Sequence, residues 1–382
     1  MSLITYLTTI RFEFGASQGL ADDVAELGIK APLIIADKGI EGAGLVDRLK
    51  GVLPRGQDVP VFTETPTNPT ERAVLAALDL YRSEGCDGLI AIGGGSPIDL
   101  AKGVALLSTH GGPLEQYAAI LGGVPKITSA VAPLIAVPTT AGTGSEVGRA
   151  ALITLVDGRK LGFISPHLIP KRAVCDPELT LGLPPGLTAA TGMDAITHCI
   201  ETFLSPRINP PAEAIALDGL VRALSNIEQA VAQGSNREAR YEMMMAALEG
   251  GLTFQKGLGA VHALSHPLGG LQQVSLHHGT LNAVLLPYVL EFNEDHSGAK
   301  YATLRQRLGL DANADLADYI RNLNKRLGMP TTLVEMGVPH GSLAEIAESA
   351  TKDHSSATNP RPASAGDYLA ILEAAYSGGP LR

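Results

Sequence analysis

Short apolar runs alternate with helix-like spacing through the first half of the chain. The apolar runs lie at residues 31–37, 58–64, 87–96 and 132–146. Between them, residues 71–85 and 96–108 carry apolar side chains at the spacing of a helix. Strands that are buried on both faces appear as continuous apolar runs, so this alternation predicts a mostly parallel sheet with helices packed on it.

The pattern changes near residues 176–177, where an Asp-Pro pair precedes the segment LTLGLPPG. Beyond it, helical spacing dominates, first at 188–205 and then more clearly at 211–234. We therefore expect two domains: an α/β domain over residues 1–178 and an all-helical domain over residues 179–382.

Composition limits the class of protein. Of the 382 residues, 45% are apolar and 18% are charged, against about 25% charged in an average chain, which predicts a large buried core. A net charge of −10 and the absence of Trp argue against a nucleic-acid partner. The uncharged stretch 127–145 contains Pro133 and Pro138, so we interpret it as a strand and a loop and expect no membrane span. Three distant cysteines without a CxxC pair favour a reduced, cytoplasmic protein.

Two glycine-containing turns follow predicted strands. Residues 93–96 read Gly-Gly-Gly-Ser and lead into a helix, with Ser96 as the expected N-cap and Pro97 in the first turn. Residues 139–145 form a second such loop, rich in Thr and Gly. Glycines let a phosphate approach the backbone, and a helix N-terminus offers N–H donors to it. Either turn alone could be a tight connection, but two of them at strand ends of one sheet favour a nucleotide site.

An acid at the end of the first apolar run bears on the choice of nucleotide. Asp37 closes the segment APLIIAD. A carboxylate there can accept hydrogen bonds from an adenosine ribose and would repel a 2′-phosphate, which favours NAD over NADP. The alternative is that Asp37 is a turn residue before Lys38 and Gly39.

Possible metal ligands gather in the second half. Asp194 and His198 are four residues apart in a predicted helix, as are His262 and His266, and a His-His pair follows at 277–278. Carboxylate and imidazole ligands together suit Zn²⁺ or Fe²⁺ rather than Ca²⁺ or Mg²⁺. A single histidine could equally be a hydrogen-bonded core residue, and spacing does not choose three or four ligands among the six candidates.

The chain as a whole resembles a known family, the iron-containing (group III) alcohol dehydrogenases. The resemblance runs through nearly the whole chain and is carried by the motifs GGGSPIDLAKG, PTTAGTGSE, DPELTLGLPP, TGMDAITHCIE, GAVHALSHPLGG and HHGTLNAVLLPYVLEFN. It implies an α/β dinucleotide-binding domain followed by an all-α metal- and substrate-binding domain, the dehydroquinate synthase-like architecture. It also implies a metal-dependent, NAD(P)-linked enzyme that interconverts a small alcohol and its aldehyde or ketone by hydride transfer. The same resemblance implies a homodimer.

The resemblance assigns metal ligands one residue at a time. Asp194, His198 and His262 match family ligands, and His278 matches the fourth because the family places that ligand in an HGxxNA context. The preceding loop is longer than in many relatives, which leaves His277 as an alternative. The implied cation is Fe²⁺, with Zn²⁺ possible. His266 matches a position beside the metal, where it could relay a proton or contact substrate.

The resemblance also assigns residues around the cofactor and the pocket. The nucleotide-binding positions it implies are Asn68, Gly94, Gly95, Ser96, Asp99, Thr139, Thr140, Thr143 and Lys160, together with Asp37. Phe254 resembles a residue that lines the substrate pocket. Asp353 and the Asn-Pro-Arg segment at 359–361 match an element near the mouth of that pocket.

Three other functions compete with this interpretation. A glycerol dehydrogenase-like enzyme uses fewer protein ligands for its metal, and a maleylacetate reductase-like enzyme can dispense with the metal. The match at His278 argues against the first, and the presence of Asp194 and His198 argues against the second. A non-catalytic nucleotide- or metal-binding protein would bind NAD without turning over any carbonyl compound.

Overall fold

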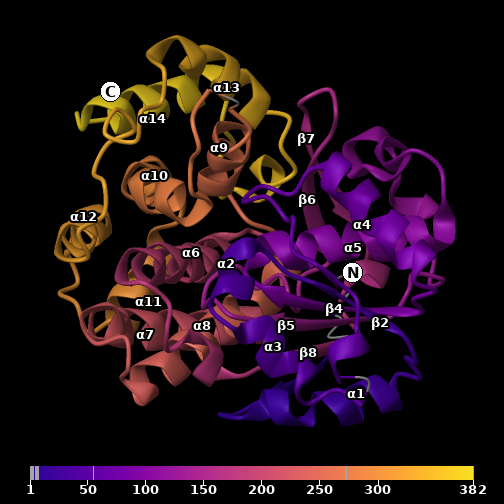
Figure 1. The fold of residues 1–382 in the computed structure, drawn as a ribbon. Helices are drawn as coiled ribbons and strands as arrows, with labels where there is room; N and C mark the ends of the chain where they lie inside the picture. Colours follow the sequence, from indigo (N-terminus) through magenta and orange to yellow (C-terminus); the bar gives the residue numbers. More distant parts are fainter. Residues whose placement is uncertain (1–3, 5–7, 55, 272, 382) are drawn as a thin grey trace. The chain divides into compact units, whose positions relative to one another are not determined.

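A computed structural model describes residue 4 and residues 8–54, 56–271 and 273–381. The chain divides into two compact units, one ending at Gly182 and the other beginning at Leu183. Figure 1 shows the first as the indigo-to-magenta part of the ribbon and the second as the rose-to-yellow part.

The first unit is built on a six-stranded parallel sheet. Its strands follow the order β1-β8-β5-β4-β2-β3. Their bounds are Thr9–Phe12 (β1), Pro32–Ile35 (β2), Val61–Phe62 (β3), Gly88–Gly93 (β4), Leu134–Pro138 (β5) and Arg172–Cys175 (β8). A separate antiparallel pair joins β6 (Ala150–Thr154) and β7 (Lys160–Ile164). The apolar runs of the sequence thus form parallel strands, as predicted.

Helices cover both faces of this sheet (Figure 1). They are α1 (Leu20–Glu26), α2 (Lys38–Gly42), α3 (Leu45–Lys50), α4 (Glu71–Ser83) and α5 (Gly95–His110). Alternate residues of β2 enter different cores: Leu33 and Ile35 pack with α4 and α5, whereas Ile34 packs with α1 and α3. Burial on both faces explains why the strands carry no polar alternation.

The start of α5 differs from the sequence prediction. The helix begins at Gly95, and its N-cap is Gly94, which makes no side-chain cap hydrogen bond. Ser96 therefore lies inside the first turn, where its hydroxyl donates a hydrogen bond to the Thr67 carbonyl. The prediction that Ser96 is the N-cap was wrong because glycine backbone already adopts the extended conformation that a cap requires.

The second unit contains helices joined by loops and, among its described residues, no strand. Its helices are α6 (Pro185–Leu204), α7 (Pro210–Ala232), α8 (Arg237–Leu252), α9 (Ala260–Leu268), α10 (His278–Asn293), α11 (Gly298–Arg307), α12 (Leu316–Arg326), α13 (Leu343–Ala350) and α14 (Ala365–Ser377). Side chains that accept from a backbone N–H begin several of them, including Asn209 for α7 and Asn236 for α8. Such caps stabilise a helix by about 1 kcal/mol each.

Helix α6 is the centre of the second unit. It packs against α7, α8 and α10, and every residue from Thr188 to Leu204 is buried. A helix that is buried all round needs small or apolar residues on every face. In the segment TAATGMDAITHCIETFL such residues are therefore not confined to one side of the helix. Among the described residues, no helix is both long and apolar enough to cross a lipid bilayer.

Candidate active site

Helix α6 carries the first two candidate ligands in its buried interior. Asp194 and His198 lie one turn apart and are 2% and 3% exposed. Gly250 of α8 allows this helix to approach His198, because a Cβ at that glycine would lie 3.1 Å from the histidine Cβ. The close packing fixes the side chains of α6 in place.

Two further helices bring imidazoles to the same carboxylate. His262 comes from α9 and His278 is the first residue of α10. Asp194 Oδ1 lies 3.4 Å from His198 Nε2 and 3.7 Å from Nε2 of both His262 and His278. These four residues can place their ligand atoms within 4.8 Å of one another, and we refer to them as the Asp194 cluster.

Glu201, which the sequence analysis missed, orients one of these imidazoles. Its Oε2 lies 2.6 Å from His262 Nδ1, and its Oε1 accepts a 2.7 Å hydrogen bond from the Val261 N–H. A carboxylate at Nδ1 holds a proton there, so the lone pair of His262 Nε2 faces Asp194. Both atoms can then act as ligands of one cation.

The amide of Asn282 lies close to three atoms of the Asp194 cluster. Its amide nitrogen lies 2.7 Å from Asp194 Oδ1 and 3.2 Å from Nε2 of both His262 and His278. An amide has two protons, so it can serve at most two of these three atoms. Three nitrogens and one carboxylate oxygen are a donor set that fits Fe²⁺ or Zn²⁺.

Charge reinforces this arrangement. Burial alone would raise the pKa of Asp194, but the imidazoles of His198, His278 and His262 outweigh burial and hold it well below its usual range. Burial lowers the pKa of His262, but Glu201 and Asp194 outweigh burial and raise it to about 9. The cluster therefore attracts positive charge, and protons compete with a metal for the same nitrogens.

His277 lies outside the Asp194 cluster. It is the N-cap residue of α10, and its Nδ1 lies 3.5 Å from the Thr280 hydroxyl oxygen. Burial lowers the pKa of its imidazole. The structure thus brings His278, rather than His277, together with Asp194.

Two other predicted residues flank the cluster. His266 stacks on His278, with ring centroids 5.7 Å apart and planes 9° apart, and its Nδ1 lies 2.8 Å from Asp353 Oδ2. Phe254 places its ring edge-on against His198 at 4.8 Å. Both side chains therefore lie where they could contact a molecule held at the cluster.

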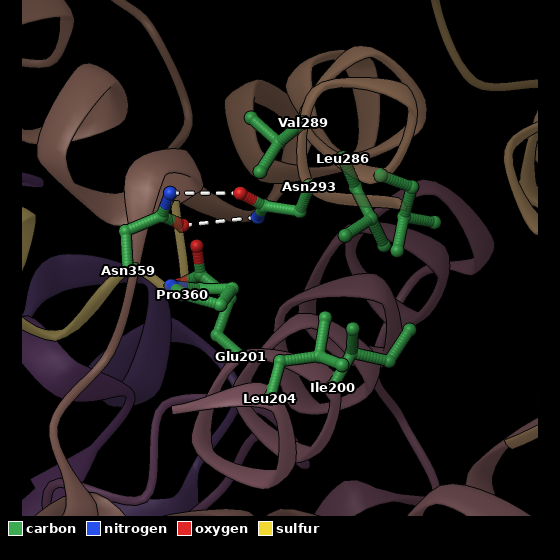
Figure 2. A pocket seen from close by; sticks show the side chains of 10 residues that line it. Ile200, Glu201, Leu204, Leu286, Val289, Asn293, Asn359 and Pro360 are labelled. Carbon is green, nitrogen blue, oxygen red and sulfur yellow. Dashed lines mark hydrogen bonds between the residues drawn. The ribbon is translucent and has the colours of Figure 1, made fainter. Parts of the chain in front are cut away.

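The predicted Asn-Pro-Arg segment at 359–361 contacts the first residue of α9. Asn359 and Asn293 exchange two hydrogen bonds of 2.8 and 3.0 Å, and Asn359 also accepts from the Ala260 N–H. Figure 2 shows this pair beside Glu201 and Pro360, in a pocket otherwise lined mainly by apolar side chains. The described lining of this pocket includes Glu201, which contacts His262, but none of the four residues of the Asp194 cluster.

The two glycine-containing turns of the first unit lie side by side. Strands β4 and β5 are adjacent, and the Thr139 N–H donates to the Gly93 carbonyl. A Cβ on Gly94 would meet Thr140 at 3.4 Å, and one on Gly95 would meet Thr143 at 3.1 Å. Gly93 has φ +144°, and a side chain there would contact Pro97 at 2.7 Å. Glycine is thus required at Gly93 by its conformation and by its contact with Pro97, whereas Gly95 packs closely against Thr143.

Unpartnered hydroxyl groups mark the same edge of the sheet. The Oγ1 atoms of Thr139 and Thr140 are buried and have no hydrogen-bond partner among the described residues, and the same holds for Thr65. Buried polar atoms are nearly always paired in native proteins. A bound ligand with hydrogen-bonding groups would supply the partners that these hydroxyls lack.

The remaining predicted cofactor residues with polar side chains lie in three different environments. Lys160 donates to Asn68 Oδ1 at 3.0 Å, so these two predicted residues are brought together. Asp99 accepts from the Ser145 hydroxyl at 2.6 Å and from the Leu152 N–H at 2.9 Å, which ties α5 to the second loop. Asp37 is the N-cap of α2 and accepts from the Ile40 N–H at 2.9 Å.

Comparisons with known proteins give matches over nearly the whole chain. A family profile described as iron-containing alcohol dehydrogenase matches residues 8–177, and its C-terminal counterpart matches residues 188–376. The chain is 55% identical over 380 residues to a 4-hydroxybutyrate dehydrogenase of Cupriavidus necator, covering 98% of this chain and 99% of that protein.

Solved structures of similar proteins also superpose on nearly the whole chain. A 1,3-propanediol oxidoreductase superposes with a TM-score of 0.92 at 36% identity and covers 98% of this chain and 100% of its own. A sulfoacetaldehyde reductase from Bifidobacterium kashiwanohense, solved in complex with NAD⁺, superposes with a TM-score of 0.89 at 28% identity, covering 99% of both chains.

Proposed function

Because the chain belongs to the iron-containing alcohol dehydrogenase family and is an oxidoreductase acting on CH–OH groups, we propose that it uses NAD and one divalent cation held by the Asp194 cluster. The cation is Fe²⁺, with Zn²⁺ as the alternative. The single observation that carries this proposal is the convergence of three imidazole nitrogens on one buried carboxylate oxygen.

When bound, the cation supplies a Lewis acid that lowers the pKa of an alcohol hydroxyl, and the nicotinamide supplies the acceptor for a hydride. The residues of the chain hold and orient the groups that would bind the cation. Glu201 holds His262 in the tautomer that points Nε2 at the cluster, and Asn282 donates to Asp194. Phe254 packs edge-on against the ring of His198 and so helps to hold that imidazole in place.

His266 is the residue best placed to move a proton. Asp353 accepts from its Nδ1, so the neutral imidazole presents the lone pair of Nε2. That nitrogen can accept the proton that leaves an alcohol hydroxyl and return it when a carbonyl compound is reduced. Asp353 acts through His266 as a positioning residue.

The nucleotide belongs to the first unit. The residues we assign to it are Asp37, Asn68, Gly94, Gly95, Ser96, Asp99, Thr139, Thr140, Thr143 and Lys160. The unpartnered Thr139 and Thr140 hydroxyls support this assignment, as does the close approach permitted at Gly94. Asp99 contributes by holding Ser145, and Asp37 favours NAD over NADP because a carboxylate repels a 2′-phosphate.

The relative from Cupriavidus necator supports a short ω-hydroxy acid as the substrate. The test is NADH formation with 4-hydroxybutyrate, 1,3-propanediol, glycerol and short alcohols, with NADPH formation and maleylacetate reduction measured in parallel. We expect metal-dependent oxidation of 4-hydroxybutyrate with NAD. Metal-independent turnover of maleylacetate alone, or NAD binding without any turnover, would contradict the proposal.

Two further properties complete the proposal: a cytoplasmic location and a homodimer. Cys86, Cys175 and Cys199 form no disulfide, which suits a reducing compartment. The homodimer follows from the family resemblance. Sedimentation velocity at micromolar concentration tests it, and a single species of about 40 kDa would contradict it, given a chain mass of 39.7 kDa.

A further inference from the structure

A second group of possible metal ligands lies beside the Asp194 cluster. It consists of His266, Asp353 and His354, whose ligand atoms lie within 4.8 Å of one another. We propose that these three residues form a second binding site for a transition-metal cation such as Zn²⁺, and that its occupation inhibits the enzyme. We refer to it as the His354 site.

The carboxylate of Asp353 lies between two imidazoles. Its Oδ2 is 2.8 Å from His266 Nδ1, and its Oδ1 is 3.6 Å from His354 Nδ1. The two rings are nearly parallel, with planes 18° apart and centroids at 5.6 Å. Zinc bonds of about 2.0–2.2 Å place tetrahedral ligand atoms roughly 3.3 Å apart. The observed spacings lie on either side of that value, so small side-chain movements suffice to bind one cation.

The donor set and its burial both suit a transition metal. Two imidazole nitrogens and one carboxylate oxygen favour Zn²⁺ or Cu²⁺ over Ca²⁺ and Mg²⁺. The side chains of His266 and Asp353 are 7% and 14% exposed, which keeps two ligands fixed. The His354 side chain is 44% exposed, so the site has an open side through which a cation enters and where water completes its coordination.

Occupation of the His354 site changes what His266 can do. A cation on His266 Nδ1 replaces the hydrogen bond to Asp353 and leaves the imidazole proton on Nε2. In the function proposed above, Nε2 must accept a proton, so a bound cation blocks that step. The inhibition therefore rests on the proposed function, whereas the binding of the cation does not.

Equilibrium dialysis tests the binding directly. Metal-free full-length protein is dialysed against increasing Zn²⁺, and the zinc bound per chain is counted by elemental mass spectrometry. We expect the wild type to take up a second equivalent, which His354→Ala binds at least about tenfold more weakly. His340→Ala is the matched control, because His340 is an exposed imidazole 3.0 Å from the Glu373 carboxylate and belongs to neither ligand group found among the described residues.

The outcomes separate the two proposals. A wild-type curve without a second equivalent, or a His354→Ala curve that superimposes on it, would overturn the His354 site. Absence of the first equivalent would contradict the proposed function instead, and uptake that depends on His354 would still support the second site. In the same samples, alcohol oxidation should fall as the second zinc binds to wild type but not to His354→Ala. Zinc that binds through His354 without slowing turnover would overturn the inhibitory role.

Discussion

At the scale of single residues, the chemistry depends on which nitrogen of each imidazole is available. Glu201 settles this for His262 and Asp353 settles it for His266, in both cases by accepting from Nδ1. Neither carboxylate contributes to the Asp194 cluster. Substitutions at these residues therefore change the positioning of an imidazole without removing a ligand of the Asp194 cluster.

We predict that Glu201→Gln weakens cation binding by roughly 10- to 100-fold while the helical content is unchanged. The amide can replace only one of the two acceptors that Glu201 offers to His262 and Val261. Competition with a chelator of known affinity measures the effect. Glu228→Gln, which alters a carboxylate paired with Arg326 on the surface, is the control. Equal affinities for the two variants would refute the role of Glu201.

His266→Ala should keep the cation and slow alcohol oxidation by about 10²- to 10⁴-fold, the usual contribution of a positioned acid or base. The dependence of kcat on pH should flatten with it, because the group that accepts the proton is missing. Metal analysis and rate measurements from pH 5 to 9 provide the check. Unchanged rates across that range would count against a relay through His266.

At the scale of elements, the site depends on how closely three helices can approach. Gly279, next to His278, is the tightest point: a Cβ there would lie 2.1 Å from the Ala190 carbonyl oxygen of α6. The glycine therefore lets α10 lie against α6 with His278 near Asp194. By contrast, a Cβ on Gly298 at the start of α11 would meet no atom within 4 Å.

Gly279→Ala is expected to lower the free energy of unfolding by about 1–3 kcal/mol, the usual cost of overpacking a close contact. It should also weaken cation binding, because α10 must move away from α6. Thermal unfolding with and without Fe²⁺ measures both effects, and Gly298→Ala serves as the control. A Gly279→Ala protein as stable and as well metallated as wild type would show that the helix contact is not limiting.

Sequence patterns predicted most elements but only part of the site. The spacing of apolar residues located β4, α5 and α6, because buried positions of a strand or helix are occupied mainly by apolar side chains. The four-residue spacing in helices found Asp194 with His198, but spacing could not choose between His277 and His278, since that choice depends on how α10 begins. Asn282 follows His278 by four residues and Glu201 follows His198 by three, so a search for polar residues on the ligand-bearing helix faces could have found both.

His354 could not be recognised in this way. It carries no periodic signal, and its partner His266 lies far away in the sequence. The contact exists only because α9 and the segment after α13 pack together. Long-range packing of this kind is not recorded in local spacing, and for the same reason the pairing of Glu201 with His262 was missed.

At the scale of the whole molecule, buried charges in the first unit make stability depend on pH. Glu146 is 3% exposed, and burial raises its pKa to about 6 from 4.5, although Lys102 opposes the shift. Lys102 is buried too, and its ammonium group donates to Ser145 and to two backbone carbonyls. The native state therefore binds a proton at Glu146 more tightly than the unfolded chain does.

The sign of the effect follows from this difference in pKa. The stabilising contribution of the Glu146 proton is complete below pH 4.5 and is lost as the pH rises through about 6. We predict that the unfolding free energy of wild type, relative to Glu146→Gln, falls by about 2 kcal/mol between pH 4 and 7. Denaturant titrations across this range test it, and parallel profiles for the two proteins would refute it.

The central claim is that one cation in the Asp194 cluster is required for alcohol oxidation. The most direct test measures metal content and activity on the same anaerobic preparation. Apoprotein is titrated with Fe²⁺, and NADH formation is followed at each addition for wild type, His340→Ala and His262→Ala. We predict that activity in the first two rises in proportion to bound iron up to one ion per chain, and that His262→Ala loses bound iron and activity together. Full turnover by His262→Ala without bound metal would contradict the account.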